Sequence, residues 1–332
     1  MVEFGVGITG VGSFVPEKIM TNSDLEKIVD TSNEWIIDRT GIEERRIAEE
    51  NIATSDIAAI AAQRAMEDAK VLPEEIDLIL VATISPDYIF PSTACMVQKH
   101  IGATNAAAFD INAGCTGFIY ALTTAKGFVK SGIYKKVLVI GAETLSKIVN
   151  WKDRNTCVLF GDGAGACIVE PCEDGFGMLA EDLGSDGSKG DVLIVPAGGS
   201  KKPTSLETVE EGLNFIKMDG REVFKFAVRI MEKASNDVLK KAGLTSKDID
   251  LLVPHQANIR IIDAALKKLD LEKEKVFVNL EKYGNTSAAS IPVALDEALD
   301  QKRIRKGDNL LLVAFGAGLT WGGVVLKWNK EE

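Results

Sequence analysis

The feature that most constrains this fold is a repeated order of short apolar runs in the two halves of the chain. The first half offers four candidate strands, each bounded by turn residues, at 76–81, 107–111, 136–141 and 166–169. The second half offers four more in the same order, at 249–253, 276–280, 309–313 and 323–326. Helical stretches separate these runs, and such alternation is typical of layered α/β proteins.

The two halves agree in the spacing of their predicted elements as well as in the order of those elements. The turn at Cys115 comes 39 positions after residue 76, and the turn at Ser287 comes 38 positions after residue 249. We therefore predict two similarly wound halves, residues 1–174 and 175–332, with the seam in the Gly-, Ser- and Lys-rich interval 175–218. Chance agreement between unrelated α/β segments is the alternative.

Composition limits the classes of protein that these halves can form. Of the 332 residues, 46% are hydrophobic and 26% charged, which suffices for a large core and excludes intrinsic disorder. The five cysteines include no CxxC pair and there are two histidines, so no disulfide framework, zinc cage or multi-histidine metal site is expected. The net charge of -11 argues against nucleic acid or an anionic membrane as a partner.

The chain also lacks the signals of a membrane or exported protein. No apolar stretch approaches the roughly 20 residues that span a bilayer, and residues 1–4 lack the basic region and apolar run of an export signal. Scattered cysteines suit a reducing compartment. We therefore expect a soluble cytoplasmic protein.

The best-placed thiol is that of Cys115. It follows the predicted strand 107–111 and a turn of small residues, and it lies in the first turn of the next predicted helix. A helix N-terminus stabilises a thiolate and lowers the thiol pKa, so Cys115 is the candidate nucleophile, with plain packing as the alternative. The other four cysteines lack such a turn and are expected to serve packing: Cys95, Cys157, Cys167 and Cys172.

Two further polar side chains follow turns at corresponding places. His255 comes directly after the predicted strand 249–253, between a proline and polar residues that indicate a rigid turn facing a pocket. Asn285 opens a helix in the counterpart of the Cys115 turn, and ligands collect at the carboxyl ends of parallel strands. A structural histidine and an ordinary helix cap are the alternatives. His100, at the expected exposed end of a helix, is given no catalytic role.

Two glycine-rich strings lead to different interpretations. Residues 161–165 precede a predicted strand, whereas a phosphate-binding loop opens a helix, so we reject a dinucleotide site there. Residues 315–322 follow one strand and turn into another. Their glycines form either a tight hairpin or an oxyanion hole of backbone N–H groups.

Taken together, the ordered motifs resemble one family, β-ketoacyl-[acyl carrier protein] synthase III, among the thiolase-like condensing enzymes. Matching segments run over nearly the whole chain, and the most specific are residues 112–118 (NAGCTGF), 160–166 (FGDGAGA), 254–258 (PHQAN) and 284–287 (GNTS). The resemblance implies a five-layered α-β-α-β-α fold, a homodimer and a triad of Cys115, His255 and Asn285.

The resemblance also implies a two-stage reaction by a multifunctional enzyme. Cys115 takes an acyl group from an acyl-CoA primer, expected to be acetyl-CoA, as a thioester. Malonyl-[acyl carrier protein] then loses CO2 and attacks that thioester, which gives a β-ketoacyl product and initiates fatty acid biosynthesis. His255 and Asn285 would donate hydrogen bonds to the enolate, and the backbone N–H groups of Cys115, Ala317 and Gly318 would bind the tetrahedral oxyanion. Ala317 replaces a glycine that is commoner in the family.

Further residues are assigned to the substrates by the same resemblance. Four are expected to contact CoA: Trp35, Arg39, Arg154 and Asn258. Three are expected to form acyl pockets: Phe90, Leu159 and Phe160. An indole and a guanidinium suit the two faces of adenine, and one phenylalanine, Phe90, would close the pocket of the partner subunit. Because acyl-CoA is a substrate, no resident cofactor is expected.

A basic surface is visible without the family. Arg221, Lys225 and Arg229 recur every four residues on one predicted helix, and three more basic residues follow His255: Arg260, Lys267 and Lys268. On so acidic a chain this area indicates docking of an acidic carrier protein, with a solvated helix face as the alternative. The family resemblance selects four of these residues for docking: Lys225, Arg260, Lys267 and Lys268.

Three other functions stay open from the sequence. Another Cys-His-Asn enzyme of this scaffold would make a secondary metabolite, and a cysteine thioester hydrolase would release free acid without needing a carrier-protein surface. A silent binding protein would never be acylated at Cys115. The length and branching of the primer depend on the shape of the pocket and are not encoded in the motifs.

Overall fold

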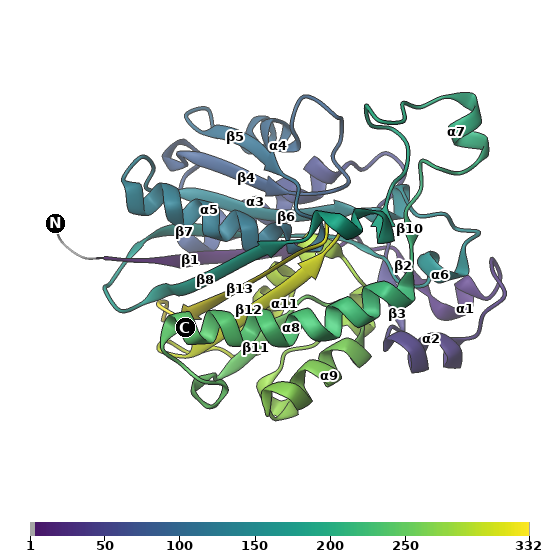
Figure 1. Cartoon of the computed structure of the whole chain (residues 1–332). Helices are drawn as coiled ribbons and strands as arrows, with labels where there is room; N and C mark the ends of the chain where they lie inside the picture. The colour runs from purple at the N-terminus through teal and green to yellow at the C-terminus, as the bar shows by residue number, and fades with distance from the viewer. Residues whose placement is uncertain (1–3, 332) are drawn as a thin grey trace.

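The structure is a computed structural model that describes residues 4–331 (Figure 1). Residues 1–3 and residue 332 lie outside the described residues. The prediction that the chain does not start with an export signal falls partly on residues 1–3. Nine strands join in the order β11-β12-β13-β8-β1-β7-β6-β4-β5. Between residues 4 and 331, no helix has the length and apolar character needed to cross a membrane.

The strands of this sheet divide between the two halves. Those of the first half are β1 (Gly5–Phe14), β4 (Leu78–Ala82), β5 (Ala107–Ile111), β6 (Val137–Thr144) and β7 (Asp162–Cys172). Those of the second half are β8 (Gly177–Ser185), β11 (Leu251–Pro254), β12 (Asn309–Gly316) and β13 (Thr320–Lys327). The short strands outside it are β2 (Ile19–Thr21), β3 (Glu44–Arg46), β9 (Leu193–Ile194) and β10 (Lys217–Met218).

The helices fall into long and short groups. The long ones are α3 (Thr54–Ala69), α4 (Thr93–Ile101), α5 (Gly117–Ser131), α8 (Gly220–Ala242), α9 (Ile259–Leu269) and α11 (Ser290–Asp300). The shorter ones are α1 (Asn22–Leu25), α2 (Asn33–Thr40), α6 (Arg154–Cys157), α7 (Leu206–Glu210) and α10 (Leu280–Tyr283). Two 3-10 turns matter for the site: η2 (Gly114–Thr116) and η7 (Ser287–Ala289).

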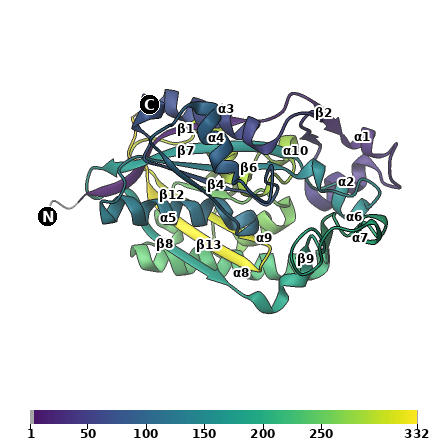
Figure 2. The ribbon, with the colours of Figure 1, turned by 90° about the horizontal axis from the view of Figure 1, so that it is seen from above.

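These elements stack in five layers. Helices α3 and α4 cover the outer face of the first-half strands, and α8 and α9 cover the outer face of the second-half strands. Helices α5 and α11 lie between and contact strands of both halves. In Figure 2, α3 and α4 lie on one side of the molecule and α8 on the other, with the strands between them. The predicted α-β-α-β-α fold is confirmed.

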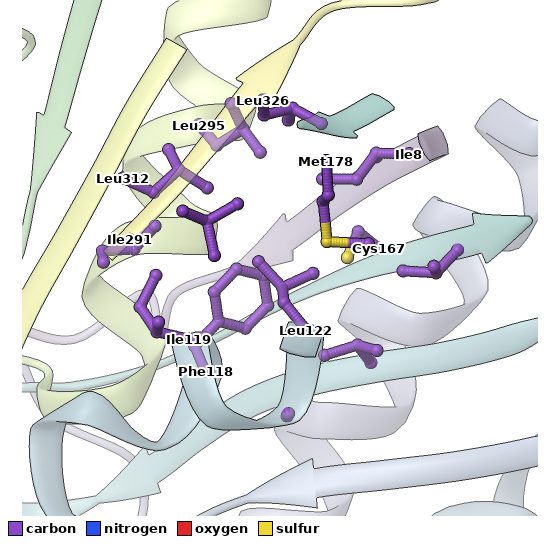
Figure 3. Close-up of a cluster of buried hydrophobic side chains, with 14 of the residues drawn as sticks. Ile8, Phe118, Ile119, Leu122, Cys167, Met178, Ile291, Leu295, Leu312 and Leu326 are labelled. Carbon is purple, nitrogen blue, oxygen red and sulfur yellow. The ribbon is translucent and has the colours of Figure 1, made fainter. Parts of the chain in front are cut away.

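The middle layer holds the largest buried cluster (Figure 3). Phe118 and Leu122 of α5 and Leu295 of α11 pack with strand residues of both halves, such as Cys167 and Leu312. All five are at most 1% exposed. Because burial of one such large apolar side chain contributes about 1.5–3 kcal/mol, this layer holds the halves together. It also explains why α5 is apolar on most faces.

The two halves share one strand order. In the first half β4 pairs in parallel with β5 and β6, and β6, β7 and β1 follow antiparallel. In the second half β11 pairs in parallel with β12, and β12, β13 and β8 follow antiparallel. The boundary at 174/175 falls in the turn between β7 and β8. The duplication itself stays a prediction from the sequence.

The predicted strand at 276–280 is wrong. Val276 forms a single bridge with Leu252, and α10 already begins at Leu280. The Gln256 side chain donates a hydrogen bond to the Phe277 carbonyl at 3.2 Å. It also accepts one from the Asn279 backbone N–H, again at 3.2 Å. These side-chain bonds replace the backbone pairing that a strand would need.

The glycine string 161–165 also lies differently from expectation. It does not precede the strand, because β7 begins at residue 162 and includes Gly163 and Gly165. A Cβ added to Gly165 would lie 2.7 Å from Pro292 of α11. This glycine therefore lets the middle layer approach the sheet closely.

Candidate active site

Cys115 lies in η2, the turn that leads from β5 into α5. The residue is 7% exposed. Gly114 before it has a φ of 56°, and a Cβ added there would lie 2.7 Å from the Ala317 backbone nitrogen. A Cβ added to Gly316 would lie 2.5 Å from the Cys115 nitrogen. Both positions require glycine, because backbone segments from opposite halves pass in contact beside the thiol.

The acidity of this thiol differs from the prediction. Burial raises the pKa of Cys115 to about 12; the Ser287 hydroxyl opposes this rise, and the nearby Glu143 carboxyl adds to it. The predicted lowering of the thiol pKa by the helix N-terminus is therefore wrong. Cys115 is a protonated thiol at neutral pH, and it would have to lose its proton in order to act as a nucleophile.

The other cysteines follow the packing prediction with one exception. Cys157 and Cys167 are buried, and Cys172 is half-buried. Cys95 is exposed on α4, so the packing prediction is wrong there. Its Sγ lies 3.8 Å from the Ala108 carbonyl of the neighbouring strand β5.

His255 directly follows β11, and its ring is buried, with the residue 1% exposed. Burial lowers the pKa of the imidazole to about 3, so His255 is neutral at neutral pH. Its Nδ1 lies 2.7 Å from Ser290 Oγ, which accepts a hydrogen bond from the Gln256 N–H at 3.3 Å. When the Ser290 hydroxyl donates to Nδ1, the ring hydrogen lies on Nε2, which is then a donor.

The Asn285 side chain makes the kind of bond that a helix-capping residue makes, and this bond also orients its amide group. Its Oδ1 accepts a hydrogen bond from the Ser287 N–H at 2.8 Å, which leaves the Nδ2 hydrogens free as donors. Its backbone N–H donates to the Leu159 carbonyl at 2.8 Å, and its carbonyl accepts from Gly161 at 3.1 Å. The turn of the second half is thus tied to the first half.

One cavity of about 90 Å³ brings the three polar side chains together, with Cys115, His255 and Asn285 all in its wall. The rest of the wall is mainly apolar and includes Leu159 and Phe160, two of the residues expected at the acyl pocket. The third, Phe90, is not in this wall, and the residue is 84% exposed.

The hairpin between β12 and β13 contains Ala317 and Gly318, the residues expected to supply oxyanion N–H groups. Gly316, just before them, lines the cavity, whereas these two do not. The Thr320 Oγ lies 2.9 Å from the Ala113 carbonyl and 3.0 Å from the Ala317 carbonyl, which ties the hairpin to the Cys115 turn. This glycine string therefore forms a hairpin, and the Gly316 backbone within it also lines the cavity beside the thiol.

A wider groove of about 780 Å³ opens beside the cavity and shares Leu159 and Asn258 with it. Trp35 and Arg39 of α2 line this groove. The Arg154 guanidinium lies 5.0 Å from the centre of the Trp35 ring, and that of Arg39 lies 5.8 Å away. The four residues expected to contact CoA thus lie at or beside one groove.

Asn258 has a structural duty at this place. Its Nδ2 donates to the Arg39 carbonyl at 2.9 Å, and its Oδ1 accepts from the Arg260 N–H at 2.9 Å as the cap of α9. The side chain therefore joins α2 to α9 and fixes the groove wall.

The four predicted docking residues are all exposed, and they lie on α8 and α9, which pack against each other. Lys225 forms an ion pair with Glu222 at 2.8 Å, and Lys268 forms one with Glu232. Arg260 and Lys267 form no ion pair with another residue of 4–331. Two of the four basic side chains are thus neutralised by carboxylates, so the surface formed by α8 and α9 is less positive than its number of basic residues indicated.

Sequence reasoning missed several groups of the site. Ser290, Ser287 and Glu143 touch or face the polar triad, yet no local pattern distinguishes them. The signal for Ser287 was its place in the turn equivalent to that of Cys115. Ser290 and Glu143 could be found only from the folded chain.

Comparison with known proteins gives one consistent result. A family model described as 3-oxoacyl-[acyl-carrier-protein (ACP)] synthase III matches residues 109–187, and its C-terminal counterpart matches residues 239–328. The chain is 62% identical over 328 residues to beta-ketoacyl-[acyl-carrier-protein] synthase III of Caldanaerobacter subterraneus subsp. tengcongensis, with 99% of each chain covered.

Two solved structures extend this result. The 3-oxoacyl-[acyl-carrier-protein] synthase III of Aquifex aeolicus has a TM-score of 0.90 at 51% identity, covering 98% of this chain and 100% of that chain. The priming β-ketosynthase of the R1128 polyketide biosynthetic pathway has a TM-score of 0.90 at 35% identity, covering 99% of this chain and 97% of that chain.

Proposed function

This chain belongs to the 3-oxoacyl-[acyl-carrier-protein] synthase III family, and from that premise we propose how its own residues perform the reaction. The chain is a condensing acyltransferase that initiates fatty acid biosynthesis by joining an acyl-CoA primer to malonyl-[acyl carrier protein]. The secondary-metabolite alternative is not favoured, since the polyketide enzyme is 35% identical and the fatty acid relative 62%.

The observation that carries the proposal is a buried thiol that shares one cavity with two oriented hydrogen-bond donors. In the first stage the Cys115 sulfur attacks the carbonyl carbon of the acyl-CoA thioester. The bond between that carbon and the CoA sulfur breaks, and CoA leaves as a thiol. The N–H of Cys115 and those of Ala317 and Gly318 are proposed to bind the oxyanion formed on the way.

In the second stage malonyl-[acyl carrier protein] enters and loses CO2, and negative charge develops on its thioester oxygen. The His255 Nε2–H and the Asn285 Nδ2–H are proposed to stabilise this enolate. A neutral imidazole held as a donor by Ser290 supports this role better than one of acid or base. The enolate carbon then attacks the carbonyl carbon of the Cys115 thioester, the bond from that carbon to the Cys115 sulfur breaks, and the β-ketoacyl product leaves on the carrier.

The wide groove is the proposed binding site for CoA. Trp35 and Arg154 would hold the adenine between them, and Arg39 would contact the nucleotide. Since each stacked contact needs about 3.5 Å, the present 5.0 Å between the Trp35 ring and Arg154 must widen on binding. Asn258 would serve by fixing the groove wall.

A homodimer is proposed from the free edge of the sheet. Strand β5 ends the strand order, and its Phe109 is 39% exposed. Nearby apolar side chains are exposed as well: Tyr88, Ile89 and Phe90. An apolar edge strand of this kind favours pairing with a second copy, which would carry Phe90 into the partner's acyl pocket. Sedimentation as a monomer at working concentration would overturn this part.

An acidic carrier protein is the proposed partner of the basic surface. Arg260 supports this most strongly, because it is exposed at the start of α9 and has no ion pair within the described chain. Lys225, Lys267 and Lys268 extend the surface. We further propose that no resident cofactor is needed and that the enzyme acts in the reducing cytoplasm, where Cys115 stays a free thiol.

The test is intact-protein mass spectrometry after a mixture of acyl-CoAs is offered, followed by addition of malonyl-[acyl carrier protein]. We expect one acyl adduct on the protein, and then its loss as a β-ketoacyl carrier and CO2 form. The preferred adduct identifies the primer. Release of free acid without the carrier would indicate the hydrolase, and absence of any adduct would overturn the proposal.

A further inference from the structure

The hydroxyl of Thr320 joins the two backbone segments that meet beside Cys115. Thr320 is the first residue of β13, and its Oγ lies 2.9 Å from the Ala113 carbonyl and 3.0 Å from the Ala317 carbonyl. It also lies 3.0 Å from the Oγ of Thr116, the residue that follows Cys115. In the part of the chain that the structure describes, both side-chain hydrogen bonds between the Cys115 turn and the β12–β13 hairpin involve this hydroxyl. The reaction described above gives it no role.

The chemistry of the partners fixes the direction of these hydrogen bonds. A carbonyl oxygen can only accept, and a threonine hydroxyl has one hydrogen. The Thr320 hydrogen is therefore shared between the carbonyls of Ala113 and Ala317, and Thr116 donates to the Thr320 oxygen. Because Thr116 is 0% exposed, this donor is shielded from bulk solvent. The Thr320 hydroxyl thus bonds to one carbonyl from each half of the chain.

The two carbonyls belong to the segments that carry the proposed oxyanion donors. Ala113 lies two residues before the Cys115 N–H, and the Ala317 carbonyl belongs to the peptide group whose N–H is that of Gly318. The segments also touch, because a Cβ added to Gly114 would lie 2.7 Å from the Ala317 nitrogen. One hydroxyl therefore bonds to both of the segments whose N–H groups must converge on a single oxygen.

Other hydrogen bonds hold each segment in place within its own half. The Leu319 N–H donates to the Asp186 carbonyl and the Asp186 N–H donates to the Leu319 carbonyl, both at 2.8 Å, so the hairpin is attached to the chain that follows β8. The Ala113 carbonyl also accepts from the Thr116 N–H at 3.2 Å, which closes η2. Loss of the Thr320 hydroxyl should therefore leave both segments folded and remove a bond between them.

We propose that Thr320 is a positioning residue for the oxyanion donors, because its hydroxyl holds the N–H groups of the two halves at the separation that suits one thioester oxygen. The oxyanion forms twice, when Cys115 attacks the acyl-CoA and when the enolate attacks the Cys115 thioester. Decarboxylation instead develops charge on the malonyl oxygen, where His255 and Asn285 are the proposed donors. The inference rests on the proposed function, because it requires acylation of Cys115.

The experiment compares Thr320→Val, which replaces the hydroxyl by a methyl group, with Thr320→Ser, which keeps the hydroxyl. Thr320→Val should slow single-turnover acylation by saturating acetyl-CoA about 10- to 100-fold, because displacement of reacting groups by about 1 Å costs up to about 100-fold. The acetyl-CoA concentration at half-maximal rate should stay unchanged, since the oxyanion exists only during the reaction. CO2 release from malonyl-[acyl carrier protein] should stay at the wild-type rate, and Thr320→Ser should restore acylation.

Thr9→Val is the matched control. Thr9 is also a half-buried strand residue, and its Oγ donates to Glu170 of the neighbouring strand β7 at 2.6 Å. The change removes a hydroxyl bond between two strands of the first half, so acylation should stay unchanged. If Thr320→Val fails to fold by circular dichroism, Thr116→Val tests the same link, because it removes the donor that orients the Thr320 oxygen. We expect a smaller loss of acylation from it, again without loss of CO2 release.

Three outcomes would overturn the inference. One is acylation of Thr320→Val at the wild-type rate. The second is an equal loss of acylation and of CO2 release, which would mean that the hydroxyl supports the fold of the whole site. The third is equal slowing in Thr320→Ser and Thr320→Val, because the hydroxyl would then not be the group that matters. Lack of acylation in the wild type would instead overturn the proposed function, and this inference with it.

Discussion

The two halves of the molecule share a strand order but differ at the strand that precedes each functional turn. In the first half β5 is a complete strand that leads into the Cys115 turn, and its outer edge is free. In the second half the counterpart is reduced to one bridge at Val276, and the Gln256 side chain bonds the backbone that follows. The first half thus keeps a regular strand before its functional turn. In the second half, hydrogen bonds from the Gln256 side chain replace the backbone pairing of such a strand.

This difference corresponds to different tasks. A nucleophile needs a close backbone approach, which Gly114 and Gly316 permit. Two donors need fixed orientations, which bonds from Ser290 and Ser287 supply to His255 and Asn285. The proposed nucleophile therefore comes from the first half and the two side-chain donors from the second, and substitutions can test this division.

The largest effect is expected for the first-half nucleophile. Cys115→Ala should reduce acyl transfer from CoA below detection and leave the fold intact, because it removes the attacking sulfur and only a small side chain. Intact mass spectrometry and circular dichroism measure both. Persistence of a covalent acyl adduct would show that another group is the nucleophile.

The same turn permits a check of thiol acidity. Since burial raises the pKa of Cys115, exposed Cys95 should react first with iodoacetamide near neutral pH. Peptide mapping that finds Cys115 alkylated first would contradict this.

A smaller and more selective loss is expected in the second half. His255→Ala and Asn285→Ala should each slow decarboxylation of malonyl-[acyl carrier protein] about 100- to 1000-fold, because each removes one enolate donor. Acylation of Cys115 should remain. Measurement of CO2 release and of adduct formation separates the two stages. Equal loss of both would mean that His255 acts as a base on the thiol and would end the division between halves.

Two of the buried titratable groups, His255 and Glu143, should give opposite pH dependence of stability. The pKa of His255 falls from 6.5 to about 3, so its contribution is present above pH 6.5 and is lost as pH falls toward 3, by up to about 5 kcal/mol. The pKa of Glu143 rises from 4.5 to about 7, so its contribution is present below pH 4.5 and is lost as pH rises to 7.

Urea denaturation of His255→Gln and Glu143→Gln between pH 4 and 8 measures both contributions. Relative to the wild type, His255→Gln should gain stability on the acid side, and Glu143→Gln should gain it on the neutral side. The same trend in both variants would refute the opposite signs assigned to the two burials.

The smallest effect concerns the outer layer of the second half. Arg260→Glu together with Lys225→Glu should raise the KM for malonyl-[acyl carrier protein] about tenfold at low salt, equivalent to about 1.4 kcal/mol, and less at high salt. Acylation from acyl-CoA should change little. Lys70→Glu, the same charge change at an exposed site in the opposite half, is the control. Equal effects on the CoA and carrier substrates would exclude docking at this surface.

The order of the fold was predictable because each buried strand is a short apolar run between turn residues. The places of Cys115, His255 and Asn285 followed from the same pattern, since each comes soon after such a run or its counterpart. The strand at 276–280 was wrongly predicted because its apolar residues suit a strand, and nothing local reveals the bonds from Gln256.

Electrostatic properties were less predictable. The local rule of a helix N-terminus favoured an acidic Cys115, but burial, which depends on the whole fold, reversed the direction of the pKa shift. The pairing of Lys225 with Glu222, three residues away, was visible in the sequence, whereas that of Lys268 with Glu232 requires two helices to be adjacent. Glu143 and Ser290 acquire significance only through contacts between distant segments.

The contact between Gly316 and the Cys115 backbone has a consequence for synthesis on the ribosome. The strand that ends at Gly316 and the one that follows it are translated after Cys115 and after both His255 and Asn285. Until they emerge, the Cys115 turn lacks the Gly316 backbone beside it, and the His255 N–H lacks the Val313 carbonyl to which it donates. A nascent chain that stopped before Gly316 would therefore leave this thiol more accessible to electrophiles and oxidants than it is in the folded protein.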